Sequence, residues 1–168
     1  WLTINAGATV TNKPGSLLRL VTSPSGGSFS TIGGGGNLVN EGALRNDFQS
    51  ATAGHTIMID TANFNNSGTV NFLADGVNPT KPLLISAAGT HTGTFTVDAG
   101  HELRFEQPNT FQAASTVNNT GTLVFSGGTH NLQGAYTGTT GAVKMSGGTT
   151  LVNFDTTGGA VTFASLDV

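Results

Sequence analysis

Nine carboxylates are the first residues of this chain that could carry out chemistry. They are Glu41, Asp47, Asp60, Asp75, Asp98, Glu102, Glu106, Asp155 and Asp167. Polysaccharide-cleaving enzymes need two acids beside one glycosidic bond, or clustered acids that bind calcium together with a basic residue. Asp98, Glu102 and Glu106 lie closest together, but residues 107–154 contain no carboxylate that could serve as their partner. We therefore interpret the acids as solvated surface groups.

Four histidines are the next candidates: His55, His91, His101 and His130. His91 and His130 stand in matching Gly-Thr-His phrases, and their separation corresponds to two predicted coils. In a stack of strands they would lie two layers, or about 9.6 Å, apart. That is too far for one metal ion, whose His nitrogens lie about 2.0–2.1 Å from it. We predict that both are exposed strand residues and that the chain has no catalytic, cofactor-binding or metal-ligating residue.

Threonine spacing raises a third possibility, because flat arrays of Thr-x-Thr pairs can bind ice. The candidate pairs are Thr92/Thr94/Thr96, Thr120/Thr122 and Thr137/Thr139. They stand at different offsets from the nearest recurring glycine, which argues against a common plane. Threonine also favours strands for its own conformational reasons. We expect these residues to lie on solvated strand faces.

Sugars are the remaining ligand class with a signal in the sequence. Trp1 and Tyr136 are the candidates for surface rings on which a sugar could stack. Two glycosylation sequons, Asn65-Asn-Ser67 and Asn118-Asn-Thr120, are predicted at corners between strands. The sequons mark places where an attached glycan could be tolerated, although a bacterial protein would usually leave them bare. The two rings make surface glycans the alternative binding partner.

These residues are carried by a repeating phrase: a small polar residue, any residue, Gly, a small or polar residue, then an aliphatic one. Its glycines are Gly7, Gly42, Gly68, Gly100, Gly121, Gly141 and Gly159. From Gly100 onward the intervals between them are short and nearly equal, which indicates a solenoid of coils that cannot bury their apolar side alone. The longer intervals before Gly42 and before Gly100 predict loop insertions near residues 22–36 and 75–82. A coil that lacks the phrase would explain these intervals equally well.

Short apolar alternations bounded by Gly, Asn, Asp and Ser predict strands throughout, and no segment has a helical period. We predict an all-β chain, a right-handed parallel β-helix (β-solenoid) with coils of about 20 residues. Most phenylalanines fall at predicted core positions, as does Val143. Residues 1–168 form a single array. Because the chain begins with Trp1 and ends on an apolar strand without a visible cap, we expect it to be a segment of a longer protein.

Composition limits location and partners. Only 9% of the residues are charged and the net charge is −3. The six basic residues form no stripe, so nucleic acid is a poor partner. Apolar runs are far shorter than the ~20 residues of a membrane helix, so we expect no membrane insertion. Low charge and a surface rich in Thr, Ser and Asn are typical of extracellular or cell-surface β proteins. With no cysteine, zinc–thiolate and iron–sulfur sites are excluded.

Two stretches resemble the repeats of a known group: Gly89-Thr-His-Thr-Gly-Thr-Phe-Thr-Val-Asp-Ala-Gly100 and Asn119-Thr-Gly-Thr-Leu-Val-Phe-Ser-Gly-Gly-Thr129. They are similar to the repeats of bacterial extracellular β-helix proteins, namely autotransporter passengers and filamentous-haemagglutinin-like surface proteins. The resemblance covers residues 89–168 best. It implies an extracellular location and a stalk-like shape more than an activity. Regular coils, scarce charge, absent cysteine and uncapped ends favour a non-enzymatic structural or adhesive segment of a surface protein or extracellular filament. We expect it to self-associate through its solenoid ends or through neighbouring repeats. The alternative is a β-helix that binds or cleaves polysaccharide along a lateral face.

Overall fold

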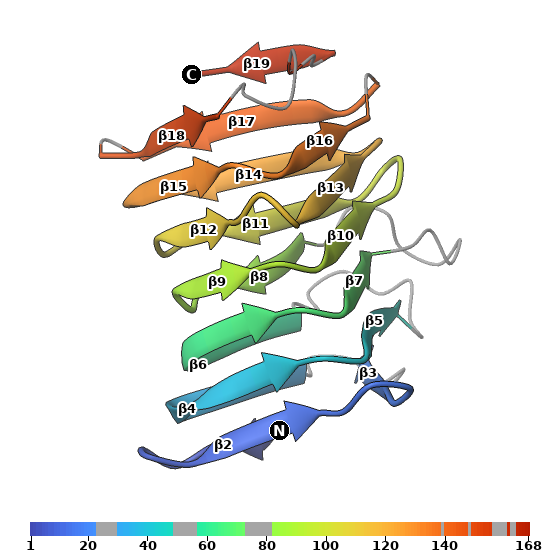
Figure 1. Ribbon diagram of the computed structural model, residues 1–168, viewed down its shortest axis with the longest axis vertical. Coiled ribbons are helices and arrows are strands. Elements are labelled where there is room, and N and C mark those ends of the chain that lie inside the picture. The colour runs from blue at the N-terminus through green and yellow to red at the C-terminus, as the bar shows by residue number, and fades with distance from the viewer. Residues whose placement is uncertain are drawn as a thin grey trace.

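The protein is a parallel β-solenoid (Figure 1). We describe it from a computed structural model, which describes residues 1–22, 30–48, 57–72, 82–138, 140–147, 149–155, 161 and 164–168. Every element of secondary structure in these residues is a strand. Successive coils stack along the long axis of Figure 1, and each strand pairs in parallel with its equivalents in the neighbouring coils. The predicted all-β solenoid is confirmed.

Each coil has up to three faces, which we number in chain order. Face 1 contains β1 (Leu2–Thr3), the first halves of β4 (Ser30–Asn40) and β6 (Ile57–Asn66), β8 (Pro82–Ile85), β11 (Glu102–Phe105), β14 (Thr122–Ser126), β17 (Ala142–Ser146) and β19 (Ser165–Asp167). Face 2 contains β2 (Thr9–Asn12), the second halves of β4 and β6, β9 (Gly89–His91), β12 (Asn109–Phe111), β15 (Thr129–Leu132) and β18 (Leu151–Phe154).

Face 3 forms a separate sheet. It contains β3 (Leu17–Thr22), β5 (Ala43–Phe48), β7 (Thr69–Phe72), β10 (Thr94–Val97), β13 (Thr116–Asn119) and β16 (Ala135–Thr137). We call the bends between faces 1 and 2, 2 and 3, and 3 and 1 the first, second and third corners.

Coil length changes along the rod. On face 1, Ile85 pairs with Phe105 and Phe105 with Phe125, which are equal steps along the chain. Nearer the N-terminus, Ile32 pairs with Ile59, and Ile59 with Ile85, so each of these coils contains more of the chain. The average spacing is roughly 23 residues. The predicted period therefore holds in the C-terminal half, and the earlier coils are longer.

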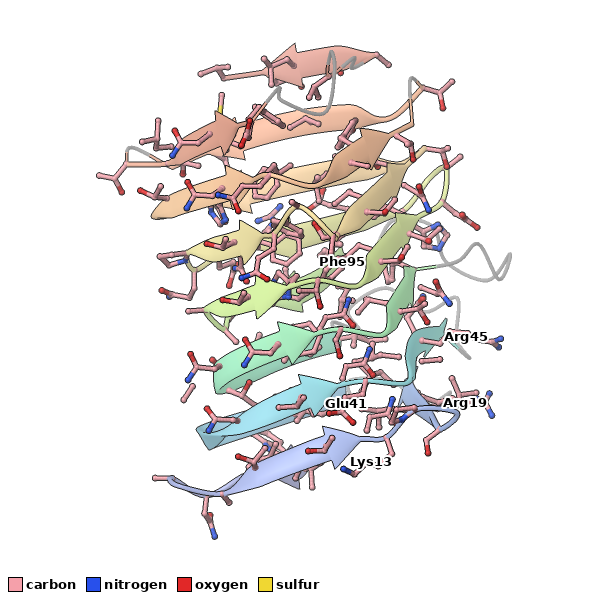
Figure 2. All side chains as sticks on the ribbon, viewed as in Figure 1. Lys13, Arg19, Glu41, Arg45 and Phe95 are labelled. Atoms are coloured by element: carbon pink, nitrogen blue, oxygen red, sulfur yellow. The ribbon has the colours of Figure 1, made fainter. Side chains whose placement is uncertain are left out.

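The core consists of columns of apolar side chains that run along the axis. Strand residues alternate between buried and half-buried in β7, β8, β10 and β11, as the alternating geometry of a strand requires. Ile59, Ile85, Phe105 and Phe125 follow one another in register and have no exposed surface. Phe95 fills the interior from face 3 (Figure 2). Each such side chain contributes about 1.5–3 kcal/mol by its burial.

The repeated sequence phrase occupies three different corners. Gly7 lies at the first corner, Gly42 and Gly68 at the second, and Gly100 and Gly121 at the third. The interval from Gly68 to Gly100 therefore spans one coil plus one further strand, as well as the segment between β7 and β8. The uneven intervals therefore reflect this change of corner as well as the unequal lengths of the coils.

The loop predicted at residues 22–36 is wrong for its described part. Residues 30–36 belong to β4, whose register against β6 shifts between Gly34 and Asn37. Gly34 has a φ of +114°, a conformation that favours glycine, so the glycine run lets one long strand turn the first corner. Residues 23–29 lie outside the described residues. Of the predicted loop 75–82, Pro82 is the first residue of β8 and the rest lies outside the described residues.

A spine of buried asparagines closes the second corner in the first three coils. Asn12 Nδ2 donates to Asn40 Oδ1, and Asn40 Nδ2 donates to Asn66 Oδ1, each at 2.7 Å. Asn66 Nδ2 donates to the carbonyl of Thr94 at 3.3 Å. Asparagine suits this position because its amide is both donor and acceptor and repeats at the spacing of stacked strands. The next residue in the column is His91.

Glycine follows this spine because the coils approach closely there. A Cβ on Gly68 would lie 2.0 Å from the carbonyl oxygen of Gly42, far inside van der Waals contact. The recurring Asn-x-Gly of the second corner therefore has two separate causes: the amide satisfies buried backbone groups, and the glycine makes room for the neighbouring coil.

Candidate functional site

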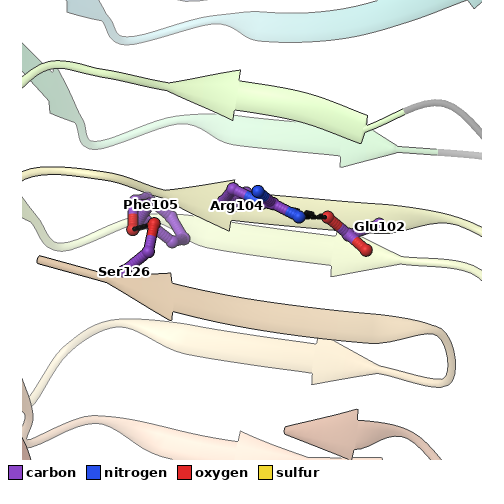
Figure 3. A network of polar contacts seen from close by, with 4 residues as sticks. All are labelled: Glu102, Arg104, Phe105 and Ser126. Carbon is purple, nitrogen blue, oxygen red and sulfur yellow. Dashed lines mark hydrogen bonds and ion pairs between the residues drawn. The ribbon is translucent and has the colours of Figure 1, made fainter. Parts of the chain in front are cut away.

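The charged side chains that come nearest to forming an active site are Glu102 and Arg104, on face 1. Arg104 Nη2 and Nε donate to Glu102 Oε1 at 2.7 and 3.1 Å (Figure 3). Both side chains are partly exposed, at 37% and 28%. Glu102 stands in register with Pro82 and Thr122, so neither of its register partners on the adjacent coils is a carboxylate. The arrangement is a surface ion pair within one strand.

Glu106 is held in a second polar contact on the same side of the rod. Its Oε2 accepts a hydrogen bond from the Ser86 hydroxyl at 2.5 Å. One coil further on, the Ser126 hydroxyl donates to the carbonyl of Phe105 at 3.3 Å (Figure 3). The contacts are hydroxyl to carboxylate and hydroxyl to backbone, and each ties one coil to the next. Their geometry fits a structural role.

The prediction that His91 and His130 are exposed is wrong, because both are fully buried. They do lie two coils apart on face 2, as the sequence predicts, but they are not in one column. His91 is in register with Phe111, and Phe111 with Leu132, whereas His130 is in register with Val152. The Gly-Thr-His phrases therefore place the two imidazoles in different columns of the core. Sequence reasoning missed this because the phrase shifts along the strand from one coil to the other.

Burial changes the acid–base behaviour of these histidines. Loss of water around the ring lowers the pKa of His91 to about 4, although a hydrogen bond to Asn109 opposes the shift. The pKa of His130 is lowered to about 4 by the same cause, opposed by the carbonyl of Gly127. Both imidazoles are neutral at pH 7. His101 is also buried, at the third corner, and His55 lies outside the described residues.

Threonines are in register on face 3, at positions that the predicted pairs only partly identified. Thr94 pairs with Thr69 on one side and Thr116 on the other. Thr96 pairs in the same way with Asn71 and Asn118, and all six side chains are half-buried. The coils that separate these residues differ in length, so the sequence spacing does not predict that they are in register. Of the other predicted residues, Thr92 and Thr120 lie at corners, Thr122 lies on face 1, and Thr139 is outside the described residues.

The predicted sugar-binding features lie elsewhere than expected. Both sequon asparagines are in strands: Asn65 Oδ1 accepts the backbone N–H of Thr90 at 2.9 Å, and Asn118 Oδ1 accepts the Thr137 hydroxyl. Tyr136 is half-buried against the core, and its hydroxyl oxygen accepts a hydrogen bond from Asn119 Nδ2 at 2.9 Å. Burial raises the pKa of this phenol. These contacts hold coils together, and the core covers part of the tyrosine ring.

One apolar groove opens at the N-terminal end of the rod, with a volume of about 310 Å³. Its lining is Trp1, Leu2, Leu18, Arg19, Leu20, Val21, Thr31 and Ile32. Trp1 is 89% exposed and Leu2 is 42% exposed, while Ile32, the register partner of Leu2, is buried. The groove is the open interior of the first coil.

Two further kinds of feature are absent from the described residues. No group of three or more histidine or acidic side chains in them is arranged to hold a metal ion. They also contain no helix with the length and apolar character needed to cross a membrane.

The stacked parallel ladders define the chain as a β-solenoid repeat protein. No family model, curated protein or solved structure matches it. The stacked coils support the resemblance of the repeats to bacterial surface β-helices at the level of architecture. A relationship to those families stays a prediction.

Proposed function

We propose that this chain is a non-enzymatic structural or adhesive segment of a bacterial cell-surface protein or extracellular filament. The observation that carries the proposal is the unbroken stack of core columns. On face 1 the column of Ile32, Ile59, Ile85, Phe105 and Phe125 is buried throughout. A solenoid of this kind lengthens by about 4.8 Å for each coil and derives its stability from contacts between neighbouring coils, which suits a stalk or fibre.

The lateral surface supports the same proposal. Exposed amides bond to their equivalents one coil away: Asn63 Nδ2 donates to Asn37 Oδ1 at 2.9 Å, and Asn153 Nδ2 donates to Asn131 Oδ1 at 2.8 Å. These contacts carry no net charge, so salt does not screen them. The chain contains no cysteine, so its coils are held together by hydrogen bonds and packing without a disulfide. Such a rod keeps its shape in an exterior of variable ionic strength.

The two ends favour self-association. Leu2 and Leu166 are 42% and 47% exposed, although their register partners Ile32 and Val143 are buried. A further coil, from this protein or from a second copy, would cover these inward positions by pairing with the open strand edge. We therefore propose the solenoid ends as the self-association surfaces.

The first test of this function is immunolabelling and electron microscopy of the native, full-length protein on its source cells. We expect label on intact cells and thin rods or fibres with an axial repeat of about 4.8 Å. Label that appears only after the cells are permeabilised would contradict the proposal. Compact particles without an axial repeat would contradict the structural role itself.

A second candidate function is polysaccharide binding along face 3. It is favoured by the two columns in register, Thr69–Thr94–Thr116 and Asn71–Thr96–Asn118, which offer hydroxyls and amides at a regular spacing. Co-sedimentation with insoluble polysaccharides tests it, and sugars released in the same assay would reveal cleavage. Thr96→Glu should abolish binding, whereas Thr110→Glu on face 2 should leave it intact. Equal binding by both variants would exclude face 3.

A further inference from the structure

His91 lies in the middle of an aromatic cluster inside the rod. Its ring centroid is 4.9 Å from those of Phe95 and Phe111, 5.8 Å from that of Phe64 and 6.0 Å from that of Phe105. These rings come from both flanking coils and from all three faces. A charge at this position would have no access to water.

Hydrogen bonds fix the tautomer of His91. The amide nitrogen of Asn109 donates to the carbonyls of Gln107 and Ala87, at 2.6 and 3.3 Å. Its Oδ1 therefore faces the imidazole, 2.8 Å from Nε2. His91 Nε2 must carry the proton and donate it, which leaves Nδ1 as a buried lone pair. This atom has no hydrogen-bond partner among the described residues.

His130 repeats the arrangement two coils further on. Its Nε2 lies 3.0 Å from the carbonyl oxygen of Gly127, so this nitrogen is also the donor. Its ring packs 4.7 Å from that of Phe125. Nδ1 is again buried without a partner in the described part of the chain. Protonation of either ring would place an N–H⁺ group where the described residues offer no acceptor.

No described charged group faces these rings. The inward residues of the strands around His91 are apolar or neutral, on β6, β8, β10, β11 and β12 alike. The charged residues of these strands, Asp60, Glu102 and Arg104, lie on the outer surface. Near His130, Glu106 is bonded to Ser86, and Lys144 of β17 is exposed. Neither imidazolium would gain a counter-ion.

We propose that His91 and His130 form an acid-sensitive element that opens the central coils when the surroundings acidify. The element goes beyond the proposed structural function and does not depend on it. In the first three coils the second-corner column is occupied by asparagines, which do not titrate. Among the described residues, the acid-sensitive element therefore lies in the centre of the rod and has no counterpart in the first three coils.

The direction and size of the effect follow from linkage. The folded-state pKa of each ring is about 4, below the unfolded value of about 6.5. The contribution of each ring to the unfolding free energy is therefore fully present above pH 6.5. It decreases as the pH falls from 6.5 towards 4, because the unfolded chain binds the proton more tightly. For His91 alone, the unfolding equilibrium constant should rise about 30-fold between pH 8 and pH 5.

The test is urea unfolding of the whole chain at pH values from 8 to 5, with His91→Gln, His130→Gln and the double variant. Gln keeps an N–H donor near the position of Nε2 but does not titrate. The double variant should lose most of the pH dependence. Thr90→His is the matched control, because it adds an exposed imidazole beside His91 and should leave the pH dependence as in the wild type. A double variant with the wild-type pH dependence would overturn the proposal.

Two measurements on the wild-type chain guard against variants that fail to fold. Hydrogen exchange at pH 5 should increase in β9, β12 and β15 and stay slow in β2, β4 and β5. Uniform exchange along the rod would overturn the proposal. So would an NMR titration in which the His91 and His130 rings protonate near pH 6.5 with the fold intact. Neither result bears on cell-surface location, which is tested separately.

Discussion

At the scale of single residues, two asparagine–asparagine hydrogen bonds of similar length differ in their surroundings. Asn40 is fully buried and donates to Asn66 Oδ1 and to the carbonyl of Thr69, whereas Asn63 is exposed and donates to Asn37. Removing the buried amide leaves acceptors that water cannot reach. We expect Asn40→Ala to cost about 3 kcal/mol of unfolding free energy in urea denaturation.

The exposed amide provides the control for this prediction. Asn63→Ala should change the unfolding free energy by no more than about 0.5 kcal/mol, because water replaces the lost contact. Equal losses in the two variants would show that the buried spine contributes no more than the surface ladder.

At the scale of strands, the sequence predicts the alternation of inward and outward residues, but it does not predict which residues pair between coils. Period-two alternation and the regular spacing of the repeat predict the all-β class and the coil length between positions 82 and 146 correctly. The Asn-x-Gly phrase recurs at three corners because each corner needs a small residue beside a polar one. Equivalent positions therefore cannot be assigned from the phrase alone. For this reason the sequence does not predict the alignment of Thr94 with Thr69 and Thr116, or the separate columns of His91 and His130, because register depends on which strands pair across coils of unequal length.

A charge in the core tests the register of β17. Val143 is fully buried between Leu123 and Leu166 in neighbouring strands, as its predicted core position requires. Val143→Asp would bury an unpaired carboxylate, and we expect a loss of about 4 kcal/mol or more by thermal or urea unfolding. Ser146→Asp adds the same charge to the same strand at an exposed position and should cost about 0.5 kcal/mol or less. Near-normal stability of Val143→Asp would refute the register.

At the scale of the whole molecule, a solenoid is stabilised by each coil's contacts with its two neighbours. The same type of residue should therefore contribute more to the unfolding free energy in the middle of the rod than at its ends. Leu103 and Leu166 test this, since one core column contains Leu83, Leu103, Leu123, Val143 and Leu166 in register. Leu103 is fully buried, and Leu166, in the last strand, is 47% exposed.

We expect Leu103→Ala to cost about 2–5 kcal/mol and Leu166→Ala less than about 1 kcal/mol, measured by urea unfolding of dilute protein. The comparison also tests end-to-end association. If a second copy covers the terminal coil, Leu166 becomes buried, and its substitution should cost more as the protein concentration rises, while the cost of Leu103→Ala stays constant. A concentration-independent difference would mean that the ends remain open in solution, and equal costs at every concentration would contradict the nearest-neighbour character of the rod.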